Sequence, residues 1–180
     1  MLRFPVQGPV AATRERGREV RERLEDLLRS AAVGEVIEID LTAVEAMTVS
    51  FADELIGRLM TARQAGEFEG QAVVIRGKGE DVRETVQAVL ERRRSGALYR
   101  DQAAGAVKPL AGPPWFSETV AEAQRLRTFS ALDLAKGLEL SPQAANNRLK
   151  QLSASGAVIR ERTVPAGGGK EYEYRAPSYT

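Results

Sequence analysis

The sequence contains neither cysteine nor histidine. Without cysteine there can be no disulfide bond and no thiol nucleophile, and without histidine there can be no imidazole base, no phosphohistidine and no His-ligated zinc. A Ser-His-Asp triad is excluded for the same reason. Because few catalytic groups remain, we expect no enzymatic activity, no catalytic residue, no bound metal and no cofactor.

Long hydrophobic runs are also missing. No stretch approaches the roughly 18–20 apolar residues of a membrane span. The opening MLRFPVQGPV lacks the basic segment and apolar run of a signal peptide. We therefore predict a cytoplasmic protein with no membrane partner. The net charge is also small, because 26 Lys and Arg are balanced by 25 Asp and Glu, although residues 116–180 hold a small excess of cations.

The first hundred residues alternate between strand and helix patterns. EVIEIDL at 35–41 alternates apolar and polar residues, whereas 12–30 repeats apolar residues at helical spacing. The same patterns predict strands at 3–6, 35–41, 71–75 and 97–100, and helices at 12–30, 50–65 and 80–94. Such alternation predicts an α/β domain over residues 1–102, a sheet covered by helices.

A break in the pattern follows at AAGAVKPLAGPP, residues 103–114, where glycine and proline are frequent and no periodicity is present. This segment is predicted to be a linker. A second, smaller α+β domain is predicted over 115–180, with helices at 117–127 and 130–137. A third helix is expected to begin at Ser141-Pro142 and to end at Gly156. Two alternating runs around Pro-Ala-Gly-Gly-Gly then predict a β-hairpin.

The segment FSALDLAKGLELSPQAANNRLKQLSASGAVIRE resembles the winged helix-turn-helix family. The resemblance implies that the third helix enters the major groove of double-stranded DNA and that the hairpin lies against the backbone. Amides pair with adenine, and Arg or Lys with guanine or phosphate. The candidate DNA-binding residues are Ser141, Gln143, Asn146, Asn147, Arg148 and Lys150 on the helix, and Arg160, Arg162 and Lys170 on the hairpin. The alternatives are a solvated helix face and a winged helix that contacts only protein.

The segment VIEIDLTAVEAMTVSFADELIGRL resembles a STAS domain, the fold of anti-sigma-factor antagonists, in its STAS-like variant. The resemblance places Ser50 at the serine that a partner kinase phosphorylates, with Thr48 as a second hydroxyl in the same loop. It implies a partner of the histidine-kinase-like ATPase class or of the anti-sigma type. A phosphate would add about −1.5 to −2 charges to a docking surface. Ser50 could instead serve only as a helix N-cap, a role that serine favours.

Together these patterns predict a transcriptional or signalling regulator, in which a STAS-like α/β domain, switched by serine phosphorylation, controls a winged helix-turn-helix that binds DNA. The alternative is a protein-interaction adaptor of the anti-sigma-factor-antagonist type, whose winged helix does not bind DNA. A homodimer is left open, because winged helices often act in pairs but no heptad pattern is present.

Overall fold

The computed structural model describes residues 1–163 and 171–179. Its main feature is a five-stranded sheet in the order β1-β3-β5-β6-β7. Strand β7 is antiparallel to β6, and the other neighbours are parallel. The strands are β1 (Leu2–Pro5), β3 (Val36–Asp40), β5 (Ala72–Gly77), β6 (Gly96–Asp101) and β7 (Val107–Ala111). Two further strands, β2 (Val10–Ala11) and β4 (Ala46–Met47), pair with each other.

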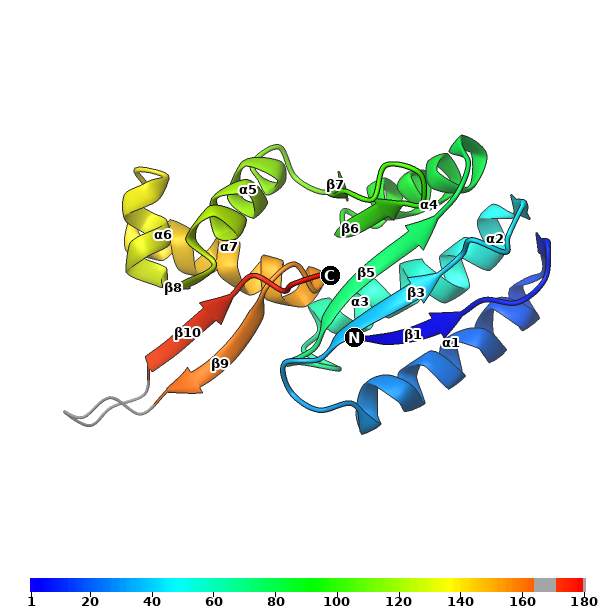
Figure 1. Ribbon diagram of the computed structural model, residues 1–180, viewed down its shortest axis with the longest axis horizontal. Helices are drawn as coiled ribbons and strands as arrows, with labels where there is room; N and C mark the ends of the chain where they lie inside the picture. The colour runs from blue at the N-terminus through cyan, green and yellow to red at the C-terminus, as the bar shows by residue number, and fades with distance from the viewer. Residues whose placement is uncertain (164–170, 180) are drawn as a thin grey trace.

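Helices cover one face of this sheet (Figure 1). They are α1 (Arg14–Ser30), a continuous helical segment made of α2 (Val49–Ala52), the π-helix η1 (Asp53–Gly57) and α3 (Arg58–Gln64), and then α4 (Glu80–Arg92). Side chains alternate across a strand, so Ile37 and Ile39 of β3 enter the core beneath the helices. The predicted mixed α/β architecture is confirmed.

The segment predicted to be a linker, 103–114, holds strand β7. Leu98 of β6 lies opposite Pro109, and Gly96 lies opposite Ala111. Proline is tolerated here because β7 is the edge strand and needs no donor on its outer side. The glycine and proline content that suggested a linker therefore marks an edge strand and the turns around it, and the sheet extends beyond residue 102.

The C-terminal unit has three helices and a three-stranded antiparallel sheet in the order β8-β10-β9. Its elements are α5 (Phe116–Leu126), β8 (Thr128–Ser130), α6 (Ala131–Gly137), α7 (Pro142–Ser155), β9 (Ile159–Thr163) and β10 (Glu171–Arg175). The helices and the hairpin strands lie where the sequence predicts them. Strand β8 was not predicted, because three residues between two helices give no alternation to detect.

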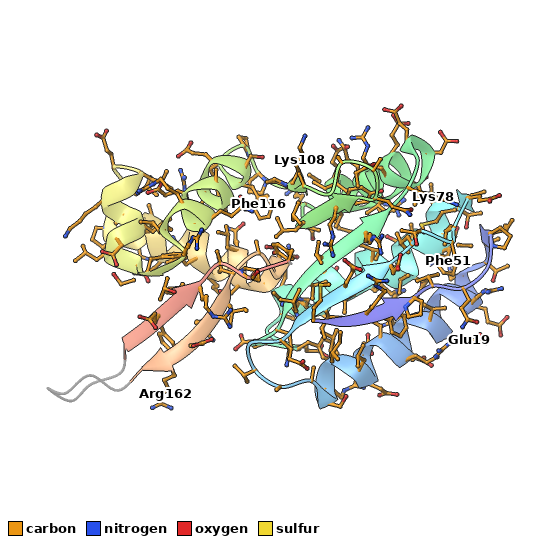
Figure 2. All side chains as sticks on the ribbon, in the orientation of Figure 1. Glu19, Phe51, Lys78, Lys108, Phe116 and Arg162 are labelled. Atoms are coloured by element: carbon orange, nitrogen blue, oxygen red, sulfur yellow. The ribbon has the colours of Figure 1, made fainter. Side chains whose placement is uncertain are left out.

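The two units share a hydrophobic core. Val36, Val74 and Leu98, on the sheet face opposite the helices, form one cluster with residues of α5, α6 and α7 such as Phe116 and Leu149. Figure 1 shows the end of α7 reaching this face, and Figure 2 shows Phe116 on the side of α5 that faces the sheet. The C-terminal unit is thus packed onto the sheet.

The remainder of that sheet face is charged. Glu38 is fully buried and lies in ion-pair contact with Arg3, Arg76 and Arg100. Arg100 also donates a 2.9 Å hydrogen bond from Nη1 to the carbonyl oxygen of Tyr179. Burial raises the pKa of the Tyr179 phenol. The C-terminal tail is therefore fixed to the sheet as well.

Candidate functional site

Helix α7 begins where the sequence predicts. The Ser141 hydroxyl accepts a hydrogen bond of 3.2 Å from the backbone N–H of Ala144, and Pro142 occupies the first turn. Ala145, Leu149 and Leu152 form its buried stripe. The predicted cap is confirmed, and it assigns Ser141 a structural role at the start of the helix.

Four predicted contact residues of α7 are exposed on its outer side: Gln143, Asn146, Asn147 and Lys150. The Gln143 amide donates to Oδ1 of Asn147 over 3.2 Å, and the Asn146 amide donates to the carbonyl oxygen of Pro142 over 2.9 Å. Each amide keeps further donor and acceptor capacity toward solvent. The N-terminal half of α7 therefore presents a polar, hydrogen-bonding surface.

Arg148 departs from the prediction, because its side chain turns inward. Its Nη1 donates to the Thr119 hydroxyl over 3.0 Å and lies 3.3 Å from a Glu118 carboxylate oxygen. Its guanidinium also lies 5.2 Å from the centre of the Trp115 ring. Only 18% of the side chain is exposed. Arg148 thus joins α7 to α5 and does not belong to the outer surface.

The predicted cations of the hairpin have different environments. Arg160 Nη2 forms a 2.8 Å ion pair with Glu69 of the N-terminal unit, and its guanidinium lies 4.8 Å from the centre of the Tyr172 ring. Arg162 is exposed and projects from β9 (Figure 2). Lys170 lies outside the described residues. Among the predicted contact residues that the structure describes, the exposed cations are therefore Arg162 and, on α7, Lys150.

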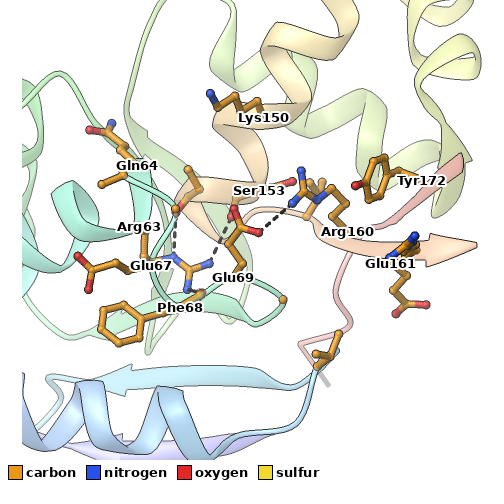
Figure 3. Close-up of a pocket in the computed structure, with 17 residues that line it drawn as sticks. Arg63, Gln64, Glu67, Phe68, Glu69, Lys150, Ser153, Arg160, Glu161 and Tyr172 are labelled. Atoms are coloured by element: carbon orange, nitrogen blue, oxygen red, sulfur yellow. Dashed lines mark hydrogen bonds and ion pairs between the residues drawn. The ribbon is translucent and has the colours of Figure 1, made fainter. Parts of the chain in front are cut away.

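A cavity of about 800 Å³ separates the hairpin from the loop 65–70 of the N-terminal unit (Figure 3). Lys150, Arg160 and Arg162 line it from the C-terminal unit, and Glu67 and Glu69 line it from the loop. The sequence analysis did not identify this loop, because a Glu-Phe-Glu segment between two glycines does not indicate which distant strand the loop will contact. The N-terminal unit thus places carboxylates beside the predicted DNA-binding cations.

Arg63 holds the loop in place. It is buried, and its guanidinium donates to four carbonyl oxygens: Phe68 (2.7 Å) and Gln71 (2.8 Å) of the loop region, and Ser153 (3.2 Å) and Ala154 (2.9 Å) of α7. Burial lowers the pKa of Arg63 to about 10. The guanidinium therefore binds both units at once.

A second candidate surface lies at the start of α2. The N-cap there is Thr48, whose hydroxyl accepts a 3.2 Å hydrogen bond from the backbone N–H of Phe51. The prediction that Ser50 caps this helix is therefore wrong. Ser50 lies two residues after the cap, in the first turn, and is exposed, and among the described residues its hydroxyl makes no hydrogen bond. Exposed apolar side chains accompany it at Val49 and, on the nearby strand β2, at Val10.

Residues 16–76 match the family model of a STAS-like domain of unknown function (DUF4325). The chain contains a STAS-like domain. The match runs from α1 to β5 and includes Thr48 and Ser50, so the resemblance seen in the sequence is confirmed for this part. The C-terminal unit lies outside the matched residues. Comparison with curated proteins and with solved structures gave no match.

Acidic side chains of the STAS-like domain next to Ser50 are held in ion pairs. Asp53 accepts hydrogen bonds of 2.7 and 2.9 Å from Arg93, which lower the pKa of its carboxyl group to about 2. Glu54 accepts bonds of 3.0 Å from Arg14 and Arg58. These carboxylates are paired with guanidinium groups, which fix α1 and α4 around the surface.

Within residues 1–163 and 171–179 no group of three or more His, Cys, Asp or Glu is arranged to hold a metal ion. None of the helices in that part of the chain is long and apolar enough to cross a membrane. The surfaces described above present exposed amides and cations on α7 and β9, and an exposed Ser50 hydroxyl next to the exposed Val49 on α2.

Proposed function

We propose that this protein is a DNA-binding regulator. In this proposal the C-terminal unit is a winged helix-turn-helix that binds duplex DNA through α7, and the STAS-like domain docks a protein partner. The order of three helices and a hairpin fits the motif. The observation that carries the proposal is the outward surface of α7, where Gln143, Asn146, Asn147 and Lys150 are all exposed.

The chemistry of this surface suits a nucleic acid. Asn and Gln amides form paired hydrogen bonds with the edge of adenine in the major groove, and Lys and Arg contact guanine or phosphate. Lys150 on α7 and Arg162 on β9 line the same cavity, so the helix and the hairpin present their cations to one region of space. The inner side of α7 is fully packed, which gives the exposed side a fixed shape.

Removing these two cations tests the proposal. Lys150→Ala combined with Arg162→Ala should weaken binding to a random 20-base-pair duplex about tenfold or more at low salt, since two phosphate contacts are lost. The slope of log affinity against log salt should fall by about 1–2 for the same reason. Fluorescence anisotropy with labelled duplex measures both quantities.

The control for this experiment removes two charges elsewhere. Lys78 and Lys108 are exposed and lie away from the hairpin (Figure 2). Lys78→Ala with Lys108→Ala should leave the affinity for the duplex within about twofold of wild type, as expected for cations that make no phosphate contact. Equal losses in both double variants would mean that binding reflects net charge only, and no loss in either would remove α7 and β9 from the interface.

The adaptor function is the second candidate, and one observation favours it. Two of the cations predicted to contact DNA, Arg148 and Arg160, form ion pairs with Glu118 and Glu69 of the same chain. A surface with fewer available cations suits a protein partner better than a polyanion. Absence of any binding to random duplex at low salt would support the adaptor and contradict the DNA-binding proposal.

We propose further that Ser50 regulates docking of the STAS-like domain to an ATPase of the histidine-kinase-like class. The support is that Thr48 caps the helix, which leaves the Ser50 hydroxyl exposed next to the exposed Val49, while the nearby strand β2 exposes Val10. A phosphate at this position would place about two negative charges in an apolar contact. It would therefore weaken the complex.

A charge-mimicking variant tests this switch. Ser50→Glu should weaken binding to a partner ATPase about tenfold or more, because a carboxylate is desolvated at the apolar surface. Ser117→Glu provides the matched control, since Ser117 is equally exposed but lies on α5. Isothermal titration with each candidate ATPase gives the affinities. If both forms bind every candidate equally, Ser50 does not control docking.

A further inference from the structure

The cavity between the loop 65–70 and the hairpin has the size of a small-molecule site. Its volume of about 800 Å³ lies within the range of roughly 300–1,000 Å³ that such sites occupy. It lies at the junction of the two units, where ligand sites are common. Its lining includes Val33 and Tyr172, which are 68% and 43% exposed although both are large and apolar. They give the cavity a partly apolar wall, whereas the Phe68 ring packs against the core of the N-terminal unit and the Arg29 guanidinium.

A polar group in the wall has no partner in the described part of the chain. Ser153 lines the cavity, and its hydroxyl oxygen is buried without a hydrogen bond. Buried polar atoms are nearly always hydrogen-bonded, and a hydroxyl can both donate and accept. Because this oxygen has almost no exposed surface, it belongs to the packed wall, and a ligand in the cavity would not contact it.

The cavity also offers a cation that is already positioned for an anion. Arg160 lies against the Tyr172 ring, and its Nη2 pairs with a Glu69 carboxylate whose side chain is 59% exposed (Figure 3). A carboxylate on an exposed loop can be replaced by another carboxylate at little cost, because exposed ion pairs are weak. Arg63 cannot take this role, since its guanidinium already donates to four carbonyl oxygens.

We propose that this cavity binds a small organic anion with a flat apolar body. The anionic group takes the place of Glu69 on Arg160, and the apolar body lies between Val33 and Tyr172. Because the walls come from both units, the site exists only while the C-terminal unit is packed on the STAS-like domain. This inference does not depend on DNA binding.

Two probes of the same shape and different charge test the proposal. By isothermal titration, 1-naphthoate should bind at one site, about tenfold more tightly than the neutral 1-naphthamide, because its carboxylate forms a charge-assisted bond with Arg160. Arg160→Gln should remove most of this difference, and any remainder would report the other exposed cations of the lining, Lys150 and Arg162. Glu69→Gln should raise the affinity for 1-naphthoate about threefold, because the competing carboxylate is gone.

Filling the cavity provides a test that does not alter charge. Ala65 lines the cavity and is exposed, so Ala65→Trp should abolish binding of both probes while the protein keeps its circular dichroism spectrum. Ala104→Trp, at an exposed turn residue outside the cavity lining, should bind as wild type does. The proposal is overturned if neither probe binds wild type, if both bind it equally, or if Ala65→Trp binds unchanged.

Discussion

Replacing Arg63 by methionine is expected to lower the free energy of unfolding by about 4 kcal/mol. Methionine fills a similar volume but donates no hydrogen bond. The four carbonyl oxygens that Arg63 binds would lose a charged donor, and each unsatisfied buried acceptor costs about 1–3 kcal/mol. Relief from burying the charge, which is visible in the lowered pKa of Arg63, offsets part of this loss. Urea unfolding followed by circular dichroism measures the change.

Two variants calibrate this result. Arg63→Lys keeps the charge but has one donor atom, which cannot reach carbonyl groups on both the loop and α7, so we expect a loss of about 2–3 kcal/mol. Arg83→Met removes an arginine that pairs only with the exposed Glu80, and it should cost less than about 1 kcal/mol. A loss below that level for Arg63→Met would show that the guanidinium does not hold the two units together.

Replacing Gly156 by alanine is expected to lower the free energy of unfolding by about 3 kcal/mol, from backbone strain and steric overlap together. Gly156 follows α7 with a φ of 79°, in the left-handed region. A Cβ there would lie 2.5 Å from the backbone nitrogen of Val73 in β5. It would also disturb the 3.2 Å hydrogen bond from that nitrogen to the Gly156 carbonyl oxygen. Thermal or urea unfolding gives the value.

The matched control separates strain from overlap. Gly105 also has a positive φ, 67°, but nothing lies within 4 Å of the position its Cβ would take. Gly105→Ala should therefore cost only about 1 kcal/mol, the penalty of the left-handed conformation. Equal losses for the two variants would mean that the close approach of Gly156 to β5 contributes nothing to stability.

Both predictions concern the same contact, the end of α7 against the STAS-like domain. Arg63 binds the carbonyl groups of the last turn, and Gly156 lets the chain pass directly over β5. Because this contact also positions the loop 65–70, it fixes Glu69 beside Arg160. Weakening it should alter the cavity, so the Arg63 variants should also bind 1-naphthoate less tightly.

Features encoded within a few neighbouring residues could be predicted from the sequence. The alternation in EVIEIDL predicts β3, and Ser141-Pro142 predicts the first turn of α7. The two hydroxyl residues at the start of α2 were recognised too, but the capping role considered for Ser50 belongs to Thr48. Thr48 and Ser50 are both favourable caps, and which one adopts extended backbone geometry depends on the pairing of β2 with β4.

The candidate site depended more heavily on residues distant in sequence. Periodicity places Arg148 at the edge of the buried stripe of α7, and only the positions of Thr119 and Trp115 determine that it turns inward. The same holds for the ion pair of Arg160, whose partner Glu69 is 91 residues away. No local sequence pattern predicts a contact between residues so far apart in the chain.

The sequence by itself determined the helices, most of the longer strands, the α/β character of the STAS-like domain and the absence of cysteine and histidine chemistry, because backbone propensity, capping and alternation act over a few residues. Only the tertiary structure decided that β7 completes the sheet, that the second unit packs on its open face and that Arg63 joins the two. Those outcomes follow from burial and hydrogen bonding between segments far apart in the chain, which form only when both surfaces are present.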